Sequence, residues 1–306
     1  MAQAVAKVTP QKLESPAWQQ WIDSIDAFLL DCDGVLWRGD AAIPGAHEMI
    51  TLMRSLGKRV VFVTNNSTKS RDTYVKKLAS QGITATVDEI VTSAWATVAY
   101  MKNEGIAGKV YFVGEAGLGQ ELTNEGYEAF GLEHSDIKEL PTPFTVDHDV
   151  KAVVVGLDRY ISYYKLAYAT VCLRQIPGCR FIGTNPDQTF PVDGAILPGG
   201  GTLVKTIECA VGREPEAVIG KPSQDLLKTI LATYNLKPAR TCMVGDRLST
   251  DIAFGRLGGL QTLLVLTGVT HESELASIEL PEYVPHHYIQ SVDVLNQLNK
   301  QSVAQN

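Results

Sequence analysis

The hydrophobic positions of this chain gather into short apolar runs, each of which ends in polar or glycine-containing residues. The runs lie at residues 27–30, 59–63, 152–155, 216–219, 241–244 and 262–266. Near-continuous apolar runs are typical of strands that are buried on both faces of a parallel sheet. The pattern therefore predicts a sheet whose strands run largely parallel.

Helical periodicity separates several of these runs. In residues 45–56, Ile50, Met53 and Leu56 recur at helical spacing, and residues 70–81 and 223–234 show the same spacing. Strand–helix alternation predicts βαβ crossovers, and hence an α/β fold with a doubly wound, Rossmann-like parallel sheet. In such a sheet, ligands bind beyond the carboxyl ends of the strands, where the polar residues of this chain lie.

The middle of the chain is typical of a separate α/β unit. It has strand-like runs at 109–113 and 151–157, a helical segment at 160–175 and glycine-rich punctuation at 194–201. We therefore predict a core domain of residues 1–103 and 214–306, with an inserted cap domain of residues 104–213 that governs substrate specificity. Residues 1–20 are expected to form a mobile leader. Their first part lacks the apolar core of a secretory signal, which leaves open a frayed leader or the remnant of a removed transit peptide.

Composition narrows the class of protein. Of the 306 residues, 45% are hydrophobic and 20% are charged, which is the balance of a folded globular chain. The formal net charge of −7 argues against binding to nucleic acid or to an anionic membrane surface. No run approaches the roughly 18 apolar residues of a membrane span. Five cysteines without a CxxC pair favour a reducing compartment over a disulfide framework.

The first candidate for chemistry is a pair of carboxylates, Asp31 and Asp33, directly after the first apolar run. Residues two apart on a strand share a face. Two carboxylates so close repel each other unless a cation lies between them or one is protonated. The pair therefore favours a Mg²⁺ site in which one carboxylate attacks phosphorus and the other handles protons. The alternative is an ordinary turn or helix cap.

Two further aspartates follow the run at 241–244. Asp246 is expected to ligate Mg²⁺ directly, because hard cations take oxygen ligands. Asp251 lies about one turn later, where it either supports the metal site or is an ordinary acid of a helix N-terminus.

The run at 59–63 ends in Thr64, Asn65 and Asn66, whose hydroxyl, amides and backbone N–H groups predict a neutral cradle for an anion. Plain helix N-capping is the alternative. Lys221, after the run at 216–219, offers a compact positive charge, with a solvated surface lysine as the alternative.

These motifs occur in a specific order, and each follows an apolar run. They are DxDG at 31–34, TNNS at 64–67, GKPS at 220–223 and GDRxxTD at 245–251. In this order the chain resembles the haloacid dehalogenase superfamily. Further segments, among them VVVGLDRYISYY at 153–164, resemble the eukaryotic phosphoglycolate phosphatases. Within them, LDRY at 157–160 and TLLVLTGVT at 262–270 are most similar to the plant and algal members. The resemblance covers roughly residues 20–295.

The resemblance implies a role for each motif. Asp31 would be the nucleophile that forms an aspartyl-phosphate, and Asp33 the general acid and base. Asp31, Asp246 and the backbone carbonyl of Asp33 would bind Mg²⁺ as cofactor.

The same resemblance assigns the phosphate-binding groups. Thr64, Asn65 and Asn66 would hold the transferring phosphoryl group, and Lys221 would neutralise it. The inserted domain would be the family's large α/β cap, and related proteins form homodimers through this domain.

The expected activity is hydrolysis of a small phosphate monoester, 2-phosphoglycolate above others. Phe190 lies where related vitamin B6 phosphatases carry a substrate-binding histidine, which argues against pyridoxal phosphate, unless Phe190 only packs the cap. Alternatives are a broader aryl or pyridoxal phosphate phosphatase and a phosphate-binding module without turnover. A dehalogenase would not need Asp33, and the inserted domain disfavours a phosphomutase through resemblance only.

Two expectations concern the cell rather than the reaction. The photosynthetic relatives act in photorespiration, so the resemblance implies the chloroplast stroma, with the cytoplasm as the alternative. Cys32, between the two aspartates, is either a redox switch or, as we expect, a strand residue that points away from the site.

Overall fold

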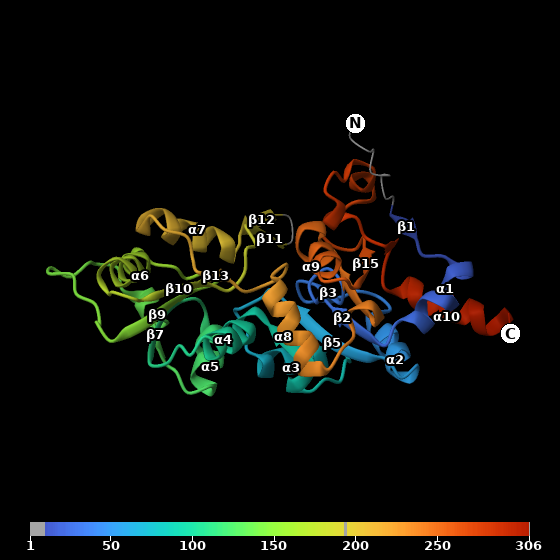
Figure 1. Ribbon diagram of the computed structural model, residues 1–306, viewed down its shortest axis with the longest axis horizontal. Coiled ribbons are helices and arrows are strands. Elements are labelled where there is room, and N and C mark those ends of the chain that lie inside the picture. Colours follow the sequence, from blue (N-terminus) through green and yellow to red (C-terminus); the bar gives the residue numbers. More distant parts are fainter. Residues whose placement is uncertain (1–9, 193–194, 306) are drawn as a thin grey trace. The chain divides into compact units, whose positions relative to one another are not determined.

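The computed structural model describes residues 10–192 and 195–305 of the chain (Figure 1). These residues divide into two compact units. The first unit holds the chain up to residue 63, residues 80–83 and the chain from residue 224 onward. The second unit holds residues 64–79 and 84–223.

A parallel sheet forms the centre of the first unit. Within this unit its strands are ordered β1 (Gln11–Lys12), β16 (His287–Ile289), β15 (Gln261–Val265), β14 (Thr241–Gly245), β2 (Ala27–Leu30) and β5 (Arg59–Thr64). Leu29 of β2 is opposite Met243 on one side and Val61 on the other, and all three side chains are fully buried. Because both faces of these strands are covered, the strands are apolar throughout.

Two groups of helices accompany this sheet. Helices α1 (Ser15–Ser24), α2 (Ala46–Ser55) and α10 (Asp293–Gln305) pack on one another. Helix α8 (Gln224–Tyr234) packs on α9 (Ala253–Leu257), which contacts β14 and β15. A short ribbon of β3 (Trp37–Arg38) and β4 (Ala41–Ala42) follows β2.

The beginning of the described chain differs from the expected leader at 1–20. Residues 1–9 lie outside the described residues. From residue 11 onward the chain forms β1 and α1, and the ring of Trp18 is fully buried. Burial of a large aromatic ring fixes this part of the chain to the first unit.

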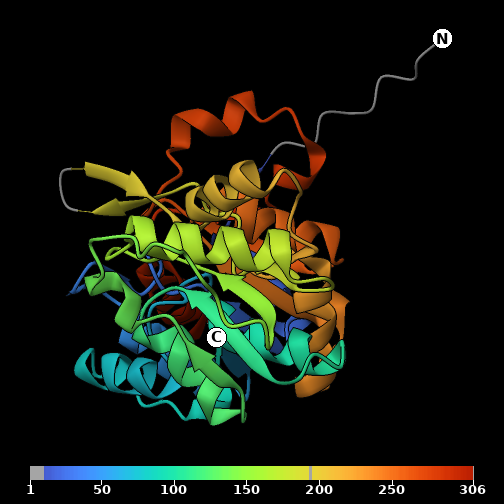
Figure 2. The same ribbon diagram turned by 90° about the vertical axis from the view of Figure 1, so that its left-hand side faces the viewer.

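The second unit has its own parallel sheet, ordered β13 (Ala217–Val218), β10 (Arg180–Gly183), β9 (Val150–Val155), β7 (Lys109–Val113) and β8 (Glu128–Phe130). Helices α6 (Tyr163–Gln175) and α7 (Gly200–Val211) lie on one side of it, and α4 (Ser93–Asn103) and α5 (Ala116–Asn124) lie on the other (Figures 1 and 2). The unit also contains α3 (Arg71–Ser80), β6 (Ile90–Thr92) and an antiparallel hairpin of β11 (Thr189–Val192) and β12 (Ala195–Pro198).

The predicted fold class, an α/β fold with doubly wound parallel sheets, is confirmed. The run at 216–219 is a shorter strand than expected, and it belongs to the second sheet, where Ala217 is opposite Ile182. The compact second unit therefore extends beyond the predicted cap at both ends, from residue 64 to residue 223. The domain boundaries at 104 and 213 stay a prediction.

Candidate active site

Three buried carboxylates gather in the first unit. Asp31 directly follows β2 and Asp246 directly follows β14, and these neighbouring parallel strands end at the same edge because Leu30 is opposite Val244. Asp251 lies in a π-helical turn at Leu248–Ile252. Carboxylate oxygens of the three residues lie within 4.8 Å of one another, and the residues are 8%, 6% and 1% exposed, respectively.

Glycine makes this close packing possible. A Cβ atom at Gly268 would lie 1.8 Å from Oδ2 of Asp246, and one at Gly34 would lie 2.4 Å from the same atom. Gly34 also has a φ of +83°, a conformation that L side chains rarely adopt. A Cβ at Gly245 would lie 2.2 Å from the Cβ of Asp251. The backbone thus encloses both carboxylates at distances that no larger residue permits.

Backbone groups fix the carboxylates in place. Val269 donates its N–H to Oδ2 of Asp246 over 2.7 Å, and Thr270 donates to the Asp246 carbonyl over 3.1 Å. Arg247 donates its N–H to Oδ2 of Asp251 over 3.1 Å. The loop after β15 is therefore part of the site.

Asp33 lies in a different environment from the three buried carboxylates. It is exposed, and the indole Nε1 of Trp37 donates to its Oδ1 over 2.8 Å. Trp37 itself is fully buried, and its carbonyl accepts the N–H of Gly34 over 2.7 Å. The rigid indole thus orients a carboxyl group that remains accessible to water and to a substrate.

The three-carboxylate cluster fits a hard divalent cation. Three negative charges this close repel one another unless a cation is bound or a proton is taken up. The donors are all oxygen atoms, the ligand type that Mg²⁺ prefers. Within residues 10–192 and 195–305, this is the one cluster of potential metal ligands, and it brings Asp31 and Asp246 together with Asp251. Their binding of Mg²⁺ stays a prediction. The backbone carbonyl of Asp33 as a ligand stays a prediction.

In the second unit, Asn65 pairs with the backbone of Lys221. Its Oδ1 accepts the Lys221 N–H over 2.7 Å, and its Nδ2 donates to the Lys221 carbonyl over 3.1 Å. Nδ2 also donates to Oδ2 of Asp187 over 3.1 Å. Lys221 is only 2% exposed, so the alternative of a solvated surface lysine is wrong. The Asn65 amide acts here by holding Lys221 in position.

Neighbouring groups hold Asn65 in turn. Its carbonyl accepts hydrogen bonds from Nδ2 of Asn185 over 2.9 Å and from Oγ of Ser93 over 2.6 Å. A Cβ at Gly220 would lie 2.7 Å from Oδ1 of Asn65, so glycine is needed before Lys221. The lysine and the asparagine therefore form one closely packed group.

Thr64 and Asn66 form the turn that follows β5. Oγ1 of Thr64 accepts the N–H of Asn66 over 3.2 Å, and Oδ1 of Asn66 accepts both the N–H and the hydroxyl of Thr68 over 2.8 Å. The alternative of plain helix capping is wrong, because α3 begins only at Arg71 and Ser70 makes the capping contact with Thr73. Their contact with a phosphoryl group stays a prediction.

Two secondary candidates are placed as follows. Phe190 lies on the β11–β12 hairpin opposite Leu197, partly exposed and outside the buried core cluster of the second unit. Cys32 is fully buried, which fits the structural alternative better than a redox switch.

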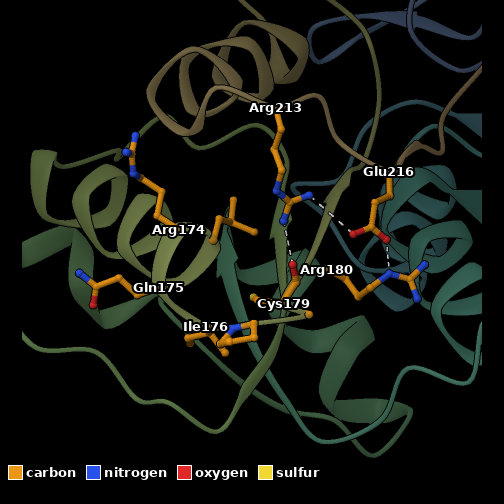
Figure 3. Close-up of a pocket in the computed structure, with 10 residues that line it drawn as sticks. Arg174, Gln175, Ile176, Cys179, Arg180, Arg213 and Glu216 are labelled. Carbon is orange, nitrogen blue, oxygen red and sulfur yellow. Dashed lines mark hydrogen bonds and ion pairs between the residues drawn. The ribbon is translucent and has the colours of Figure 1, made fainter.

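A hollow of about 390 Å³ in the second unit lies apart from the predicted residues (Figure 3). It is lined by the end of α6, the turn before β10, and Arg213 and Glu216. Glu216 pairs with both Arg180 and Arg213, and Arg213 also donates to the Cys179 carbonyl over 2.8 Å. The hollow borders the amino end of β10. Lys221 follows the carboxyl end of the parallel strand β13, so it lies at the opposite edge of this sheet.

Sequence reasoning missed four residues that support these groups. Trp37 orients Asp33, Val269 binds Asp246, and Asn185 and Asp187 bind Asn65. The tryptophan four residues after Asp33 was the one available signal, because an aromatic N–H at that spacing can reach back to a carboxylate.

Comparison with known proteins identifies the class. A haloacid dehalogenase-like hydrolase model matches residues 28–128, and a second hydrolase model of this type matches residues 218–295. The chain belongs to the haloacid dehalogenase-like hydrolase family, and the expected class of enzyme, a phosphoric monoester hydrolase, is confirmed.

Three relatives are named phosphatases. The chain is 43% identical over 284 residues to the chloroplastic phosphoglycolate phosphatase 1A of Arabidopsis thaliana, covering 90% of this chain and 78% of the relative. It is 45% identical to phosphoglycolate phosphatase 2 of the same plant (88% and 91%). It is 37% identical to human glycerol-3-phosphate phosphatase (92% and 93%).

Solved structures agree with this assignment. The p-nitrophenyl phosphatase of Archaeoglobus fulgidus is 32% identical with a TM-score of 0.76, covering 89% of this chain and 99% of that one. A glycerol phosphate phosphatase of Mycobacterium tuberculosis in complex with magnesium is 30% identical with a TM-score of 0.75, covering 90% and 77%.

Proposed function

We propose that this protein is a Mg²⁺-dependent phosphatase that hydrolyses a small phosphate monoester, 2-phosphoglycolate above others, through an aspartyl-phosphate on Asp31. The observation that carries the proposal is the cluster of Asp31, Asp246 and Asp251. A buried group of three carboxylates is costly to a fold unless a cation is bound there.

The first half of the proposed reaction is a transfer to the protein. A carboxylate oxygen of Asp31 attacks phosphorus, and the bond from phosphorus to the ester oxygen breaks. Asp33, protonated at this stage, gives its proton to the leaving alkoxide. The exposed position of Asp33, oriented by Trp37, suits a group that must reach both substrate and water.

The second half releases phosphate. Asp33, now ionised, takes a proton from a water molecule whose oxygen attacks phosphorus. The bond from phosphorus to Asp31 breaks, which restores the Asp31 carboxylate and the proton on Asp33. Inorganic phosphate and the alcohol are the products.

Charge stabilisation supplies most of the rate in phosphoryl transfer. A bound Mg²⁺, held by Asp31, Asp246 and Asp251, would neutralise charge on the phosphoryl oxygens. Lys221 adds a positive charge whose position is set by Asn65. The turn at Thr64–Asn66 would offer further donors, as the resemblance implies.

The relatives favour a small substrate. Their names include phosphoglycolate phosphatase, glycerol-3-phosphate phosphatase and p-nitrophenyl phosphatase. The two plant phosphoglycolate phosphatases, at 43% and 45% identity, are more similar to this chain than human glycerol-3-phosphate phosphatase is, at 37%. Phe190 argues against pyridoxal phosphate, because its ring cannot make the polar contact of a histidine.

A panel of four substrates tests the proposal. The purified protein is assayed with 2-phosphoglycolate, glycerol 3-phosphate, pyridoxal 5′-phosphate and 4-nitrophenyl phosphate, with Mg²⁺ and with EDTA. We expect the highest kcat/KM for 2-phosphoglycolate and loss of all activity in EDTA. A different leading substrate contradicts the phosphoglycolate assignment, and phosphate binding without turnover contradicts the phosphatase.

Two further parts of the proposal concern assembly and place. We expect a homodimer formed through the second unit, which sedimentation velocity tests. The phosphoglycolate phosphatase 1A of Arabidopsis thaliana is named chloroplastic. We propose the same location for this protein, with the cytoplasm as the alternative. Within the described residues, no helix is long and apolar enough to cross a membrane.

A further inference from the structure

A guanidinium group is held at the carboxyl edge of the second unit's sheet. Arg159 lies in the loop that follows β9, and Glu115 lies in the loop that follows the neighbouring strand β7. Nε of Arg159 donates to Oε1 of Glu115 over 2.7 Å, and Nη2 donates to Oε2 over 2.8 Å. The Glu115 carboxylate thus binds one edge of the Arg159 guanidinium, and 53% of the Arg159 side chain is exposed. An arginine has five donors, so the opposite edge can bind a second anion.

The backbone that carries Arg159 is fixed by a buried ion pair. Nζ of Lys165 bonds to Oδ2 of Asp158, and both side chains are almost completely buried. Oδ1 of Asp158 accepts the N–H of Tyr160 over 2.9 Å, and Lys165 also reaches the Gly114 carbonyl over 3.3 Å. A buried ion pair contributes little net stability, because the cost of desolvating both charges offsets their attraction. Here it fixes the residues on both sides of Arg159 and the loop that carries Glu115.

The start of α5, directly after Glu115, contacts the turn that follows β5. Gly117, two residues after Glu115, donates its N–H to the Thr68 carbonyl over 3.1 Å. A Cβ at Gly200 would lie 3.1 Å from both the Leu157 nitrogen and Nδ2 of Asn185. Asn185 in turn binds Asn65, which holds Lys221. Arg159 and Lys221 therefore belong to one connected group at this edge of the sheet.

We propose that Arg159, held in place by Glu115, binds the carboxylate of the substrate's leaving group and gives the enzyme its preference for carboxylate-bearing phosphate monoesters. This inference rests on the proposed function. A planar guanidinium matches a carboxylate through paired hydrogen bonds, whereas an uncharged leaving group offers no such partner. Glu115 limits the motion of the guanidinium, so less entropy is lost when the carboxylate binds.

The test compares Arg159→Gln with wild-type enzyme on 2-phosphoglycolate and on 4-nitrophenyl phosphate, whose leaving group carries no carboxylate. One lost charge-assisted interaction lowers kcat/KM for 2-phosphoglycolate by about 10- to 100-fold, mainly through KM. Activity on 4-nitrophenyl phosphate should stay within about twofold, since that substrate does not use the interaction. Arg159→Lys keeps the charge and should recover part of the loss. Arg174→Gln, which removes an exposed arginine of the same unit, is the matched control and should change neither value.

The outcomes separate this inference from the proposed function. If the wild type prefers 2-phosphoglycolate and Arg159→Gln keeps that preference, the role of Arg159 is wrong and the phosphatase stands. Equal losses on both substrates also contradict a leaving-group role. If the wild type hydrolyses 4-nitrophenyl phosphate but favours uncharged leaving groups, both the phosphoglycolate assignment and this inference are wrong.

Discussion

The side-chain amide of Asn65 pairs with the backbone of Lys221 through two hydrogen bonds, of 2.7 Å and 3.1 Å. The Asn65 amide thus makes the two backbone hydrogen bonds to Lys221 that a neighbouring strand would make in a sheet. The two bonds fix the backbone of Lys221, which is almost completely buried.

Loss of this pairing should reduce turnover without unfolding the protein. In Asn65→Ala, the backbone of Lys221 loses its two hydrogen bonds to the Asn65 side chain. A displacement of about 1 Å in a charge-stabilising group can cost about 100-fold in rate. We expect kcat on 4-nitrophenyl phosphate to fall by about 10- to 100-fold, measured alongside circular dichroism. Asn103→Ala, at the exposed end of α4, is the control and should stay near wild type. A folded Asn65→Ala protein with normal kcat would show that the pairing does not serve catalysis.

The glycine contacts around Asp246 predict a difference between two otherwise similar substitutions. Gly34 and Gly39 both have positive φ, but a Cβ at Gly34 would lie 2.4 Å from Asp246, whereas one at Gly39 meets nothing within 4 Å. Both alanine variants carry the backbone strain of about 1–2 kcal/mol. Only Gly34→Ala should raise the Mg²⁺ concentration needed for half-maximal activity, by about tenfold or more, because it displaces Asp246, a proposed Mg²⁺ ligand. Equal Mg²⁺ requirements in the two variants would contradict the proposed metal site.

Asp251 provides a test of the third carboxylate. Asp251→Asn keeps the size of the side chain and removes its charge, so Mg²⁺ should bind about 10- to 100-fold more weakly. Asp225→Asn makes the same change at an exposed position of α8 and serves as the control. Calorimetric titration with Mg²⁺ measures the difference, and wild-type affinity in Asp251→Asn would exclude Asp251 from the metal site.

His286 makes stability depend on pH. Burial, and then the nearby charge of Arg256, lower the pKa of His286 from 6.5 to about 4. Between pH 4 and 6.5 the unfolded chain binds more protons at this residue than the folded chain does, so the free energy of unfolding rises with pH across this window. On acidification from pH 6.5 to 4, the free energy of unfolding therefore falls by roughly 1–2 kcal/mol through His286, allowing for solvent screening of a half-buried ring. Urea unfolding of wild type and His286→Asn checks this. The difference in unfolding free energy between the two should change with pH over the window, and a constant difference would refute the role of His286.

The central strands of both sheets were predictable from sequence because they are continuous apolar runs. The runs at 27–30 and 109–113 coincide with β2 and β7. The placement of the run at 216–219 was not predictable, since β13 is two residues long and its sheet is decided by pairing with β10 rather than by its own composition.

The sequence predicted several residues of the candidate site, but not the hydrogen bonds that hold them together. Asp31 and Asp246 follow apolar runs, so their convergence at one sheet edge could be inferred from topology. The role of Asp251 could not, because an acid at the start of a helix has the same local pattern whether it faces solvent or the cluster. The pairing of Asn65 with Lys221 joins residues 156 positions apart, and it depends on the close approach that Gly220 allows.

The proposed aspartyl-phosphate on Asp31 is tested most directly by chemical trapping of the phosphorylated enzyme. The protein is mixed with excess substrate, quenched in acid within milliseconds, reduced with borohydride and digested for mass spectrometry. Borohydride converts a phosphorylated aspartate to homoserine. We predict this conversion at Asp31 and not at Asp33, and we predict none in Asp31→Asn. Hydrolysis at normal rates by Asp31→Asn, or trapping at another residue, would contradict this prediction.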